Sequence, residues 1–415
     1  MVAMEPAQVL SIVIPAYNEE AAIADIVRRC LAAREAICRA AGLQAVEIIV
    51  VDDGSRDRTR DIAASFAQAR LVIHPANRGY GAALMSGFAA ASGGLLGFLD
   101  ADGTCDPEAF VDLHRALIRE GADLAVGNRL HPGSRMPAVR RLGNRFYAAV
   151  ISRLSGVRVE DSSSGMRLFR RELLQRLQPL PAGLHFTPAM TARAACLGAR
   201  LAEVPIPYAQ RQGDSKLNVV IDGLRFLRVI LGIIFAIFPL RIFGPLGLIL
   251  ALVALGYGFG PVVYYLRFHH LEEEMIYRFL TIVTLGACSL TALCFGLVAQ
   301  SLSDMATGRR SRWLEWTPLP EGSAVAGCLL GAGAVLLNSR VIMEYVTRGR
   351  ISVHWIYVLT GGLAVISGMV LFCFGITLTL VRHLPLARCA GAGYAAVKLL
   401  ESPTNGPTTR QQGNP

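Results

Sequence analysis

Charged residues are scarce in this chain of 415 residues. Asp, Glu, Lys and Arg together make up only 17% of it, whereas hydrophobic residues make up 53% and the mean hydropathy is +0.43. This shortage of charge excludes a disordered chain, and the mixture is too apolar for a simple soluble enzyme. A partner nucleic acid is not expected either, because the basic residues gather where the apolar residues are.

Lysine is rarer still, since only Lys216 and Lys398 occur among the 41 basic residues and the others are arginines. The formal net charge is +10, of which +3 belongs to residues 1–222 and +7 to the remainder. The remainder also holds the longest apolar runs. Basic groups that flank apolar segments indicate a lipid bilayer with anionic headgroups as the partner.

Closely spaced cysteine pairs are missing. The nine cysteines are scattered and none forms a Cys-x-x-Cys pair, which argues against a zinc site and against a disulfide framework. A reduced catalytic part that faces the cytosol is the simplest interpretation. The apolar run Val9–Pro15 has no charged segment before it, because the first basic residue is Arg28, so it is not expected to be a signal peptide.

Residues 1–222 alternate between short apolar runs and segments with helical periodicity. Helices are expected over about 21–41, 57–68, 79–92 and 107–120. Continuous apolar strands separated by helices favour an α/β domain with a mostly parallel sheet that is covered on both faces. The five expected strands are Val9–Pro15, Val46–Val51, Arg70–His74, Leu95–Leu99 and Asp123–Gly127.

Glycine is absent from the first turn between a strand and a helix, which reads Pro15-Ala16-Tyr17-Asn18-Glu19-Glu20. A dinucleotide-binding domain needs glycines there, where its backbone approaches a pyrophosphate, so a dehydrogenase is disfavoured. Polar residues do follow the first, second and fourth strands. Parallel sheets bind ligands beyond the carboxyl ends of their strands, so these residues mark the expected ligand edge.

Four long segments after residue 241 contain no Asp, Glu, Lys or Arg. Their lengths are 25, 25, 18 and 31 residues, and a membrane span needs roughly 20 apolar residues. We therefore expect four spans, the alternative being buried helices of a soluble core. The shorter run Val229–Leu240 suits a helix that lies in the membrane interface. The expected spans are 243–266, 279–302, 322–339 and 354–381.

These spans divide the chain into four parts. The count of basic residues, with nine on the side of both termini and five on the other, predicts that the termini face the cytoplasm in a plasma (inner) membrane. The parts are a cytoplasmic domain over 1–222, an interfacial amphipathic helix over 223–241, a transmembrane domain over 242–382, and a disordered cytoplasmic tail over 383–415. Arg140, Arg141 and Arg145 are expected to face the membrane surface.

Two carboxylates, Asp100 and Asp102, follow the apolar strand Leu95–Leu99 directly. An Asp-x-Asp pair alone proves little, but at the ligand edge its hard oxygen atoms suit Mg²⁺ or Mn²⁺ that carries substrate phosphates. The structural alternative is that both residues cap the next helix. Asp106, which precedes Pro107, already fits that capping role.

The ordered motifs resemble a known family. SIVIPAYNEE, IIVVDDGSRDRT, NRGYGAALMSG, FLDADG, GNR, DSSSGMRLF and RQGDSK occur in order over about residues 10–220. The chain thereby resembles an inverting family-two glycosyltransferase with the GT-A fold. More narrowly, it is similar to the polyprenyl-phosphate glycosyltransferases, the group of dolichol-phosphate mannose synthase and bactoprenol glucosyltransferases.

This resemblance implies roles for named residues. Metal binding falls to Asp100 and Asp102; the mannose synthases have an amide two residues after the second Asp, where this chain has Thr104. Asp161 matches the acidic loop near the reacting centre, with a turn as the competing interpretation. The residues expected to hold the nucleoside of a sugar nucleotide are Pro15, Tyr17, Glu19 and Asp53; those expected to meet phosphates are Arg129, Arg211 and Lys216.

The expected reaction is transfer of a sugar from a UDP-glucose or GDP-mannose type donor to a polyprenyl phosphate of the undecaprenyl type, with inversion. A phosphate monoester, with a second pKa of about 6, is already a competent nucleophile and needs no general base. An alcohol acceptor would instead need Asp161 as a base. Two further interpretations are a processive polysaccharide synthase and a non-catalytic lipid-binding or flippase partner. The motif of the polysaccharide synthases is only approximated here, by Arg309–Trp313. Homo-oligomerisation is left open.

Overall fold

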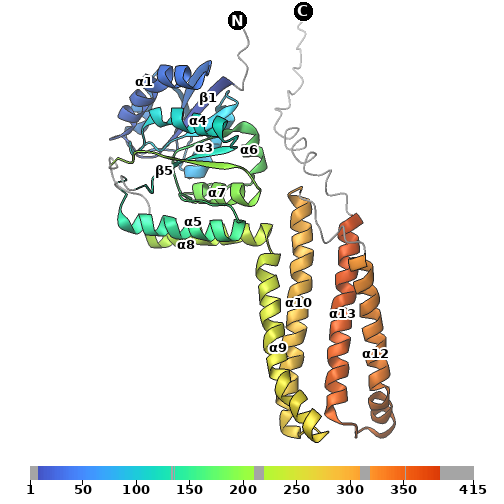
Figure 1. Cartoon of the computed structure of the whole chain (residues 1–415). Coiled ribbons are helices and arrows are strands. Elements are labelled where there is room, and N and C mark those ends of the chain that lie inside the picture. The colour runs from blue at the N-terminus through green and yellow to red at the C-terminus, as the bar shows by residue number, and fades with distance from the viewer. Residues whose placement is uncertain are drawn as a thin grey trace, which may run out of the picture. The chain divides into compact units, whose positions relative to one another are not determined.

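The computed structural model describes residues 8–131, 134, 136–209, 219–308, 318–350 and 352–383. The chain forms two compact units, Met1–Phe235 and Ala236–Pro415 (Figure 1). The expected boundary at residue 222 therefore falls inside a helix of the first unit, α8 (Val219–Ile237). The expected tail lies outside the described residues from 384 onward.

The first unit is built on one mixed sheet of seven strands in the order β3-β2-β1-β4-β6-β5-β7. All neighbours run parallel except β6, which is antiparallel to β4 and to β5. The five strands expected from the sequence are all present, and β6 and β7 are additional. The bounds are β1 Val9–Ala16, β2 Ala45–Asp52, β3 Arg70–Ile73, β4 Leu95–Phe98, β5 Leu124–Asn128, β6 Arg167–Arg170 and β7 Leu201–Pro205.

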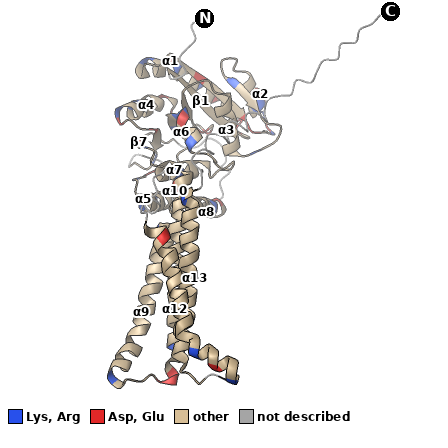
Figure 2. Ribbon diagram, turned by 90° about the vertical axis from the view of Figure 1, so that its right-hand side faces the viewer, with Lys and Arg blue, Asp and Glu red and all other residues tan. Residues whose placement is uncertain are grey.

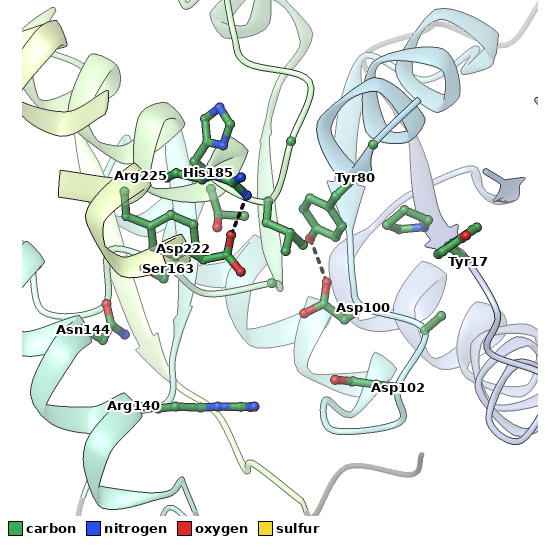
Figure 3. Close-up of a pocket in the computed structure, with 18 of the residues that line it drawn as sticks. Tyr17, Tyr80, Asp100, Asp102, Arg140, Asn144, Ser163, His185, Asp222 and Arg225 are labelled. Atoms are coloured by element: carbon green, nitrogen blue, oxygen red, sulfur yellow. Dashed lines mark hydrogen bonds and ion pairs between the residues drawn. The ribbon is translucent and has the colours of Figure 1, made fainter. Parts of the chain in front are cut away.

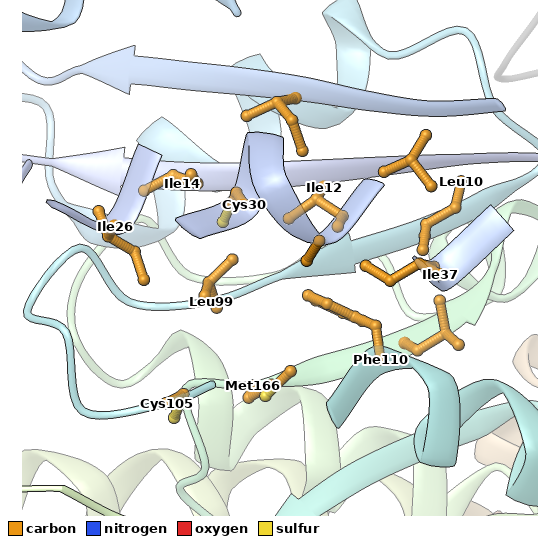
Figure 4. Close-up of a cluster of buried hydrophobic side chains, with 14 of the residues drawn as sticks. Leu10, Ile12, Ile14, Ile26, Cys30, Ile37, Leu99, Cys105, Phe110 and Met166 are labelled. Atoms are coloured by element: carbon orange, nitrogen blue, oxygen red, sulfur yellow. The ribbon is translucent and has the colours of Figure 1, made fainter. Parts of the chain in front are cut away.

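Helices cover both faces of this sheet, as expected. Along β1, Ile12 and Ile14 pack on one face, where α1 and α4 lie, whereas Val13 packs on the opposite face with α3, α6 and α7. Figure 4 shows Ile26, Cys30 and Ile37 of α1 in one cluster with the β1 side chains of Leu10, Ile12 and Ile14. The helices are α1 Ile23–Ala41, α2 Thr59–Ala64, α3 Tyr80–Ala90, α4 Phe110–Arg119, α5 Ala138–Ser155, α6 Arg171–Arg176, α7 Phe186–Cys196 and α8.

The antiparallel strand β6 positions the site. A parallel strand ends at the ligand edge, whereas an antiparallel neighbour begins there, so the loop before β6 meets the end of β4. Residues 161–165 therefore lie beside Asp100. Contact is so close that a Cβ atom on Gly165 would overlap the Asp100 carboxylate.

Among its described residues, the second unit contains four helices that are long and apolar enough to cross a membrane. Charged residues are almost absent from them except near their ends (Figure 2). The extensively packed pairs are α9 with α10 and α12 with α13. Their bounds are α9 Leu240–Phe268, α10 Ile276–Ala306, α12 Pro318–Arg348 and α13 Trp355–His383. The first three each contain one expected span, and α13 begins one residue after the start of the fourth, 354–381.

Candidate active site

A cavity of about 640 Å³ opens at the ligand edge of the sheet in the first unit. Residues that follow β1, β2, β4 and β5 contribute to its wall, as the strand-end argument predicts. The expected residues that the structure brings together there are Pro15, Tyr17, Glu19, Asp53, Asp100, Asp102 and Arg129. Asp161 lies behind Arg129 and not in the wall, while Arg211 and Lys216 fall outside the described residues.

Hydrogen bonds from backbone N–H groups to side-chain oxygen atoms join the loops after β1 and β2. Asn18 adopts a left-handed conformation with φ of 51°, and its Oδ1 atom accepts from the Arg56 backbone N–H at 2.8 Å. Its own N–H donates to Ser55 Oγ at 3.0 Å, and the Glu19 N–H donates to Thr59 Oγ1 at 2.7 Å. The two loops that carry Tyr17, Glu19 and Asp53 are therefore held as one wall.

Asp100 and Asp102 face the cavity from the turn after β4 (Figure 3). The Tyr80 hydroxyl donates to Asp100 Oδ1 at 2.7 Å. Burial raises the pKa of Tyr80 well above its usual value, and the neighbouring Asp100 charge adds to this, so the phenol remains a proton donor. Tyr80 thereby fixes the orientation of the Asp100 carboxylate.

Thr104 occupies the position at which the mannose synthases have an amide. It is buried, and both its N–H and its hydroxyl donate to Asp102 Oδ1, at 3.1 and 2.7 Å. Thr104 therefore orients Asp102. Capping of the following 3-10 helix falls to Asp106, whose side chain accepts from the Glu108 N–H, so the capping interpretation of Asp100 and Asp102 is unnecessary.

Asp161 is completely buried and forms a two-point ion pair with Arg129. Arg129 Nε lies 2.9 Å from Asp161 Oδ2, and Nη2 lies 3.0 Å from Oδ1. The carboxylate also accepts from the backbone N–H groups of Arg129 and Ser163 and from Asn144 Nδ2, which makes five donors. Because a carboxylate offers about four lone-pair positions, Asp161 is saturated.

The pKa of Asp161 is lowered although burial alone would raise it, because the charge and hydrogen bonds of Arg129 outweigh desolvation. The pKa of Arg129 is raised by the same pair, against its own burial. Both groups are therefore charged throughout the neutral range. Asp161 is a poor general base, and it holds the Arg129 guanidinium at the cavity wall.

Arg167 on β6 supports the 161–165 loop from within the core. It is fully buried, and its Nε and Nη2 atoms donate to the carbonyl oxygens of Ser164 and Ser162 at 3.0 and 2.9 Å. Burial lowers its pKa to about 10, which still leaves the guanidinium charged at neutral pH. Two buried arginines thus flank the Asp161 carboxylate.

Several wall residues were not expected from the sequence. Arg140 was assigned to the membrane-facing surface, but the structure places it in the cavity wall, because the α5 face that carries it turns toward the cavity (Figure 3). Asn144 lies one helical turn further along α5, and no local feature of the sequence marked either residue as part of the wall. The remaining unexpected polar residues of the wall are Asn77, Tyr80, Tyr147, Ser163, His185, Thr187, Tyr208, Asp222 and Arg225.

The wall formed by α5 and α8 is partly apolar. Tyr147 of α5 and Phe226 of α8 lie edge to face with ring centroids 6.0 Å apart, and the Tyr147 hydroxyl donates to the Gly223 carbonyl. Met136, Val139 and Leu184 continue this lining. The cavity thus joins a carboxylate-lined region, a cationic region and an apolar region.

Comparison with known proteins gives three relatives of similar sequence. The low-salt glycan biosynthesis hexosyltransferase of Haloferax volcanii is 34% identical, over 59% of this chain and 60% of that protein. The dolichyl-phosphate hexose transferase of the same organism is 36% identical, over 52% of this chain and 89% of that protein. The undecaprenyl-phosphate 4-deoxy-4-formamido-L-arabinose transferase of Pseudomonas paraeruginosa is 32% identical, over 52% of this chain and 62% of that protein.

Among solved structures, glucosyl-3-phosphoglycerate synthase from Mycobacterium tuberculosis matches with a TM-score of 0.44 and 26% identity, over 55% of this chain and 80% of that one. The family model described as glycosyl transferase family 2 matches residues 11–178. The chain spans less than two thirds of the length of the first and third relatives given above.

The mixed sheet, with its carboxylate pair after β4, defines a GT-A domain. The chain belongs to the family-two glycosyltransferases, as its motifs predicted.

Proposed function

We propose that this protein transfers a sugar from a nucleotide sugar to a polyprenyl phosphate with inversion at the anomeric carbon. The observation that carries this proposal is the saturated Asp161 carboxylate, which already accepts five hydrogen bonds. An alcohol acceptor would need a base at this position, whereas a phosphate does not. Two of the relatives are named for polyprenyl-phosphate substrates, which supports the same choice.

The acceptor would lie against the cationic and apolar parts of the wall. Arg129 and Arg140 supply positive charge to its phosphate, and Tyr147 and Phe226 supply apolar surface for the adjoining part of a polyprenyl chain. Fixed charges of this kind stabilise charge that develops in the transition state without reorganisation. Arg211 and Lys216, which we assign to the same phosphate by resemblance, would add to it.

The donor would occupy the wall formed by the first two loops and the turn after β4. Pro15, Tyr17 and Glu19 would contact the nucleoside, together with Asp53. The acceptor phosphate oxygen then attacks the anomeric carbon, the bond from that carbon to the diphosphate breaks, and the nucleoside diphosphate leaves with the electron pair. No proton moves in this step. An α-linked donor would give a β-linked product.

A divalent cation fits the carboxylate-lined region. Asp100 and Asp102 present hard oxygen ligands, but no group of three or more His, Cys, Asp or Glu side chains among the described residues could hold a metal alone. Mg²⁺ or Mn²⁺ would therefore draw its other ligands from the diphosphate and water, as is usual for such sites. Bound there, the cation would neutralise charge on the leaving diphosphate.

The membrane placement is part of the proposal. The four apolar helices would anchor the protein in the plasma membrane, with the GT-A domain on the cytoplasmic side, where nucleotide sugars are made. The 223–241 segment, most of which is α8, would lie near the interface. Exposed Val139, Leu142 and Phe146 on α5, with Arg145 between them, form a second surface of that kind.

The decisive experiment offers the purified protein two acceptors, undecaprenyl phosphate and undecaprenol, with a panel of labelled sugar nucleotides and Mg²⁺ or Mn²⁺. We expect one donor to give a charged glycolipid from the phosphate and none from the alcohol. Equal transfer to undecaprenol would refute the acceptor class. Release of nucleoside diphosphate without any glycolipid would refute the proposal as a whole.

A further inference from the structure

Three side chains form a hydrogen-bonded chain beside the cavity. Asp53 follows β2, His74 follows β3 and Ser86 lies on α3. His74 Nδ1 is 2.6 Å from Asp53 Oδ1, and His74 Nε2 is 2.8 Å from Ser86 Oγ. His74 and Asp53 are 5% and 3% exposed. The family motifs in the sequence gave no role to His74 or Ser86.

The hydrogen-bond chemistry fixes the direction of this chain. An ionised Asp53 carboxylate can only accept, so the proton lies on His74 Nδ1, and a neutral imidazole then accepts at Nε2 from the Ser86 hydroxyl. Asp, His and Ser in this order also occur in hydrolases. That chemistry is not supported at this cavity, because neither His74 nor Ser86 is among the residues that line it.

Asp53 is the member of the chain that does line the cavity. Its Oδ1 atom accepts from His74 and from the Arg78 N–H at 2.9 Å, whereas Oδ2 accepts from the Gly79 N–H at 2.8 Å. A carboxylate oxygen accepts about two hydrogen bonds. Within the described part of the chain, Oδ1 is thus filled and Oδ2 keeps capacity for one more donor.

The family resemblance assigns Asp53 to the base of the donor, and we propose that His74 is a positioning residue that occupies Asp53 Oδ1 and so presents Oδ2 to a ring N–H of that base. The identity of this ligand rests on the proposed function. Because the hydrogen-bond-accepting oxygen is already oriented in the free protein, nucleotide binding does not have to pay the entropy cost of ordering the Asp53 side chain. Uracil and guanine offer a ring N–H, whereas adenine and cytosine have none and would leave the carboxylate unsatisfied.

Two substitutions at one position separate the contacts of His74. In His74→Asn the amide nitrogen takes the place of Nδ1 and can still donate to Asp53. In His74→Gln the amide nitrogen takes the place of Nε2, so it can contact Ser86 but not Asp53. Ser86→Ala keeps the imidazole and removes only its far partner. His114→Asn on α4, outside the cavity wall, controls for the exchange itself.

The measurement is the dissociation constant of UDP and GDP for the full-length protein in detergent with Mg²⁺ and no acceptor. For the nucleotide that the wild type binds, we expect His74→Asn to stay within about threefold. His74→Gln should weaken binding by at least about tenfold, as for loss of a hydrogen bond to a charged group. His74→Gln should also raise the donor KM more than it lowers kcat, and Ser86→Ala should change binding by only about threefold.

Equal loss in His74→Asn and His74→Gln, or no loss in either, would overturn the assignment. Tighter binding of ADP or CDP than of UDP and GDP would do the same. Should His74→Gln fail to fold, His74→Phe, which keeps a ring but cannot donate to Asp53, takes its place with the same expected loss of at least about tenfold. A wild type that binds no nucleotide would refute the proposed function itself. If the wild type binds nucleotide and the His74 variants bind it with the same affinity, only the role of His74 is refuted.

Discussion

Gly165 has no side chain, yet it determines where the Asp100 carboxylate can lie. A Cβ atom there would overlap that carboxylate, so Gly165→Ala must displace Asp100 from its hydrogen bond with Tyr80. We expect kcat to fall at least about tenfold, the scale of losing one well-placed transition-state contact. Gly232→Ala, which adds a methyl group to open space on α8, should be neutral. Normal turnover in Gly165→Ala would contradict the coupling between the two loops.

Asp102 tests the metal assignment. Asp102→Asn keeps its size and removes the charge that would face the cation, so turnover should fall at least about a hundredfold. The matched control is Asp106→Asn, because Asn caps a helix about as well as Asp and Asp106 is not in the cavity wall. EDTA should abolish turnover in the wild type. Full activity in EDTA would remove the basis for a metal.

The sequence predicted site residues that follow strands and missed those on helices. Asp53, Asp100 and Asp102 stand directly after apolar runs, so strand-end geometry alone brings them to one edge. Arg140 and Arg225 lie on helices among other arginines, and nothing local distinguishes a residue that turns toward the cavity. Whether Arg140 and Arg225 face the cavity depends on how α5 and α8 pack, and this packing is a property of the tertiary structure.

Among the strands, β6 was not predicted from the sequence, and the reason is physical. Its four residues are Arg-Leu-Phe-Arg, so the strand lacks the continuous apolar run that identified β1, β2 and β4. Arg167 is nevertheless fully buried, because its guanidinium donates to loop carbonyl groups. The antiparallel direction of β6 was equally hidden, since strand direction follows from the connection and not from composition.

The α12–α13 pair depends on glycine contacts. A Cβ atom on Gly327 would meet the Gly368 carbonyl and the Phe372 backbone, whereas one on Gly331, a single turn away, would meet nothing within 4 Å. Gly327→Ala should therefore destabilise the protein by about 1–3 kcal/mol through overpacking. Thermal unfolding in detergent should show a lower Tm for Gly327→Ala than for Gly331→Ala. Identical Tm values would mean that the pair does not pack so closely.

At the scale of the whole molecule, the rate should follow the ionisation of the acceptor. A phosphate monoester loses its second proton near pH 6, so turnover should rise through about pH 6 and flatten above it. Asp161 adds no step there, because its lowered pKa keeps it ionised. Its stabilising effect is present above the unfolded pKa and lost only as pH falls through the lower folded value. A rate that still rises steeply above about pH 8 would indicate a different nucleophile, because the phosphate is fully ionised there.

The proposed orientation can be tested with thiol reagents. Cys38 is partly exposed in the GT-A domain, whereas Cys30 is buried and its pKa is raised to about 12 by burial, so Cys30 serves as an internal unreactive reference. A membrane-impermeant reagent should label Glu273→Cys, between α9 and α10, in intact cells, and Cys38 only in inverted vesicles. Labelling of Cys38 from outside would reverse the orientation.

Synthesis of this chain leaves its sheet unfinished until late. β4 and β5 emerge from the ribosome before β6, yet β6 is the strand that joins them. Until it arrives, β4 has an unpaired edge of the kind that misassembles or recruits another chain. The same insertion carries the 161–165 loop to Asp100 and Asp161 to Arg129. A nascent domain therefore joins β4 to β5 and brings the 161–165 loop to Asp100 in the same step, before β7 and α8 complete the sheet and the cavity wall.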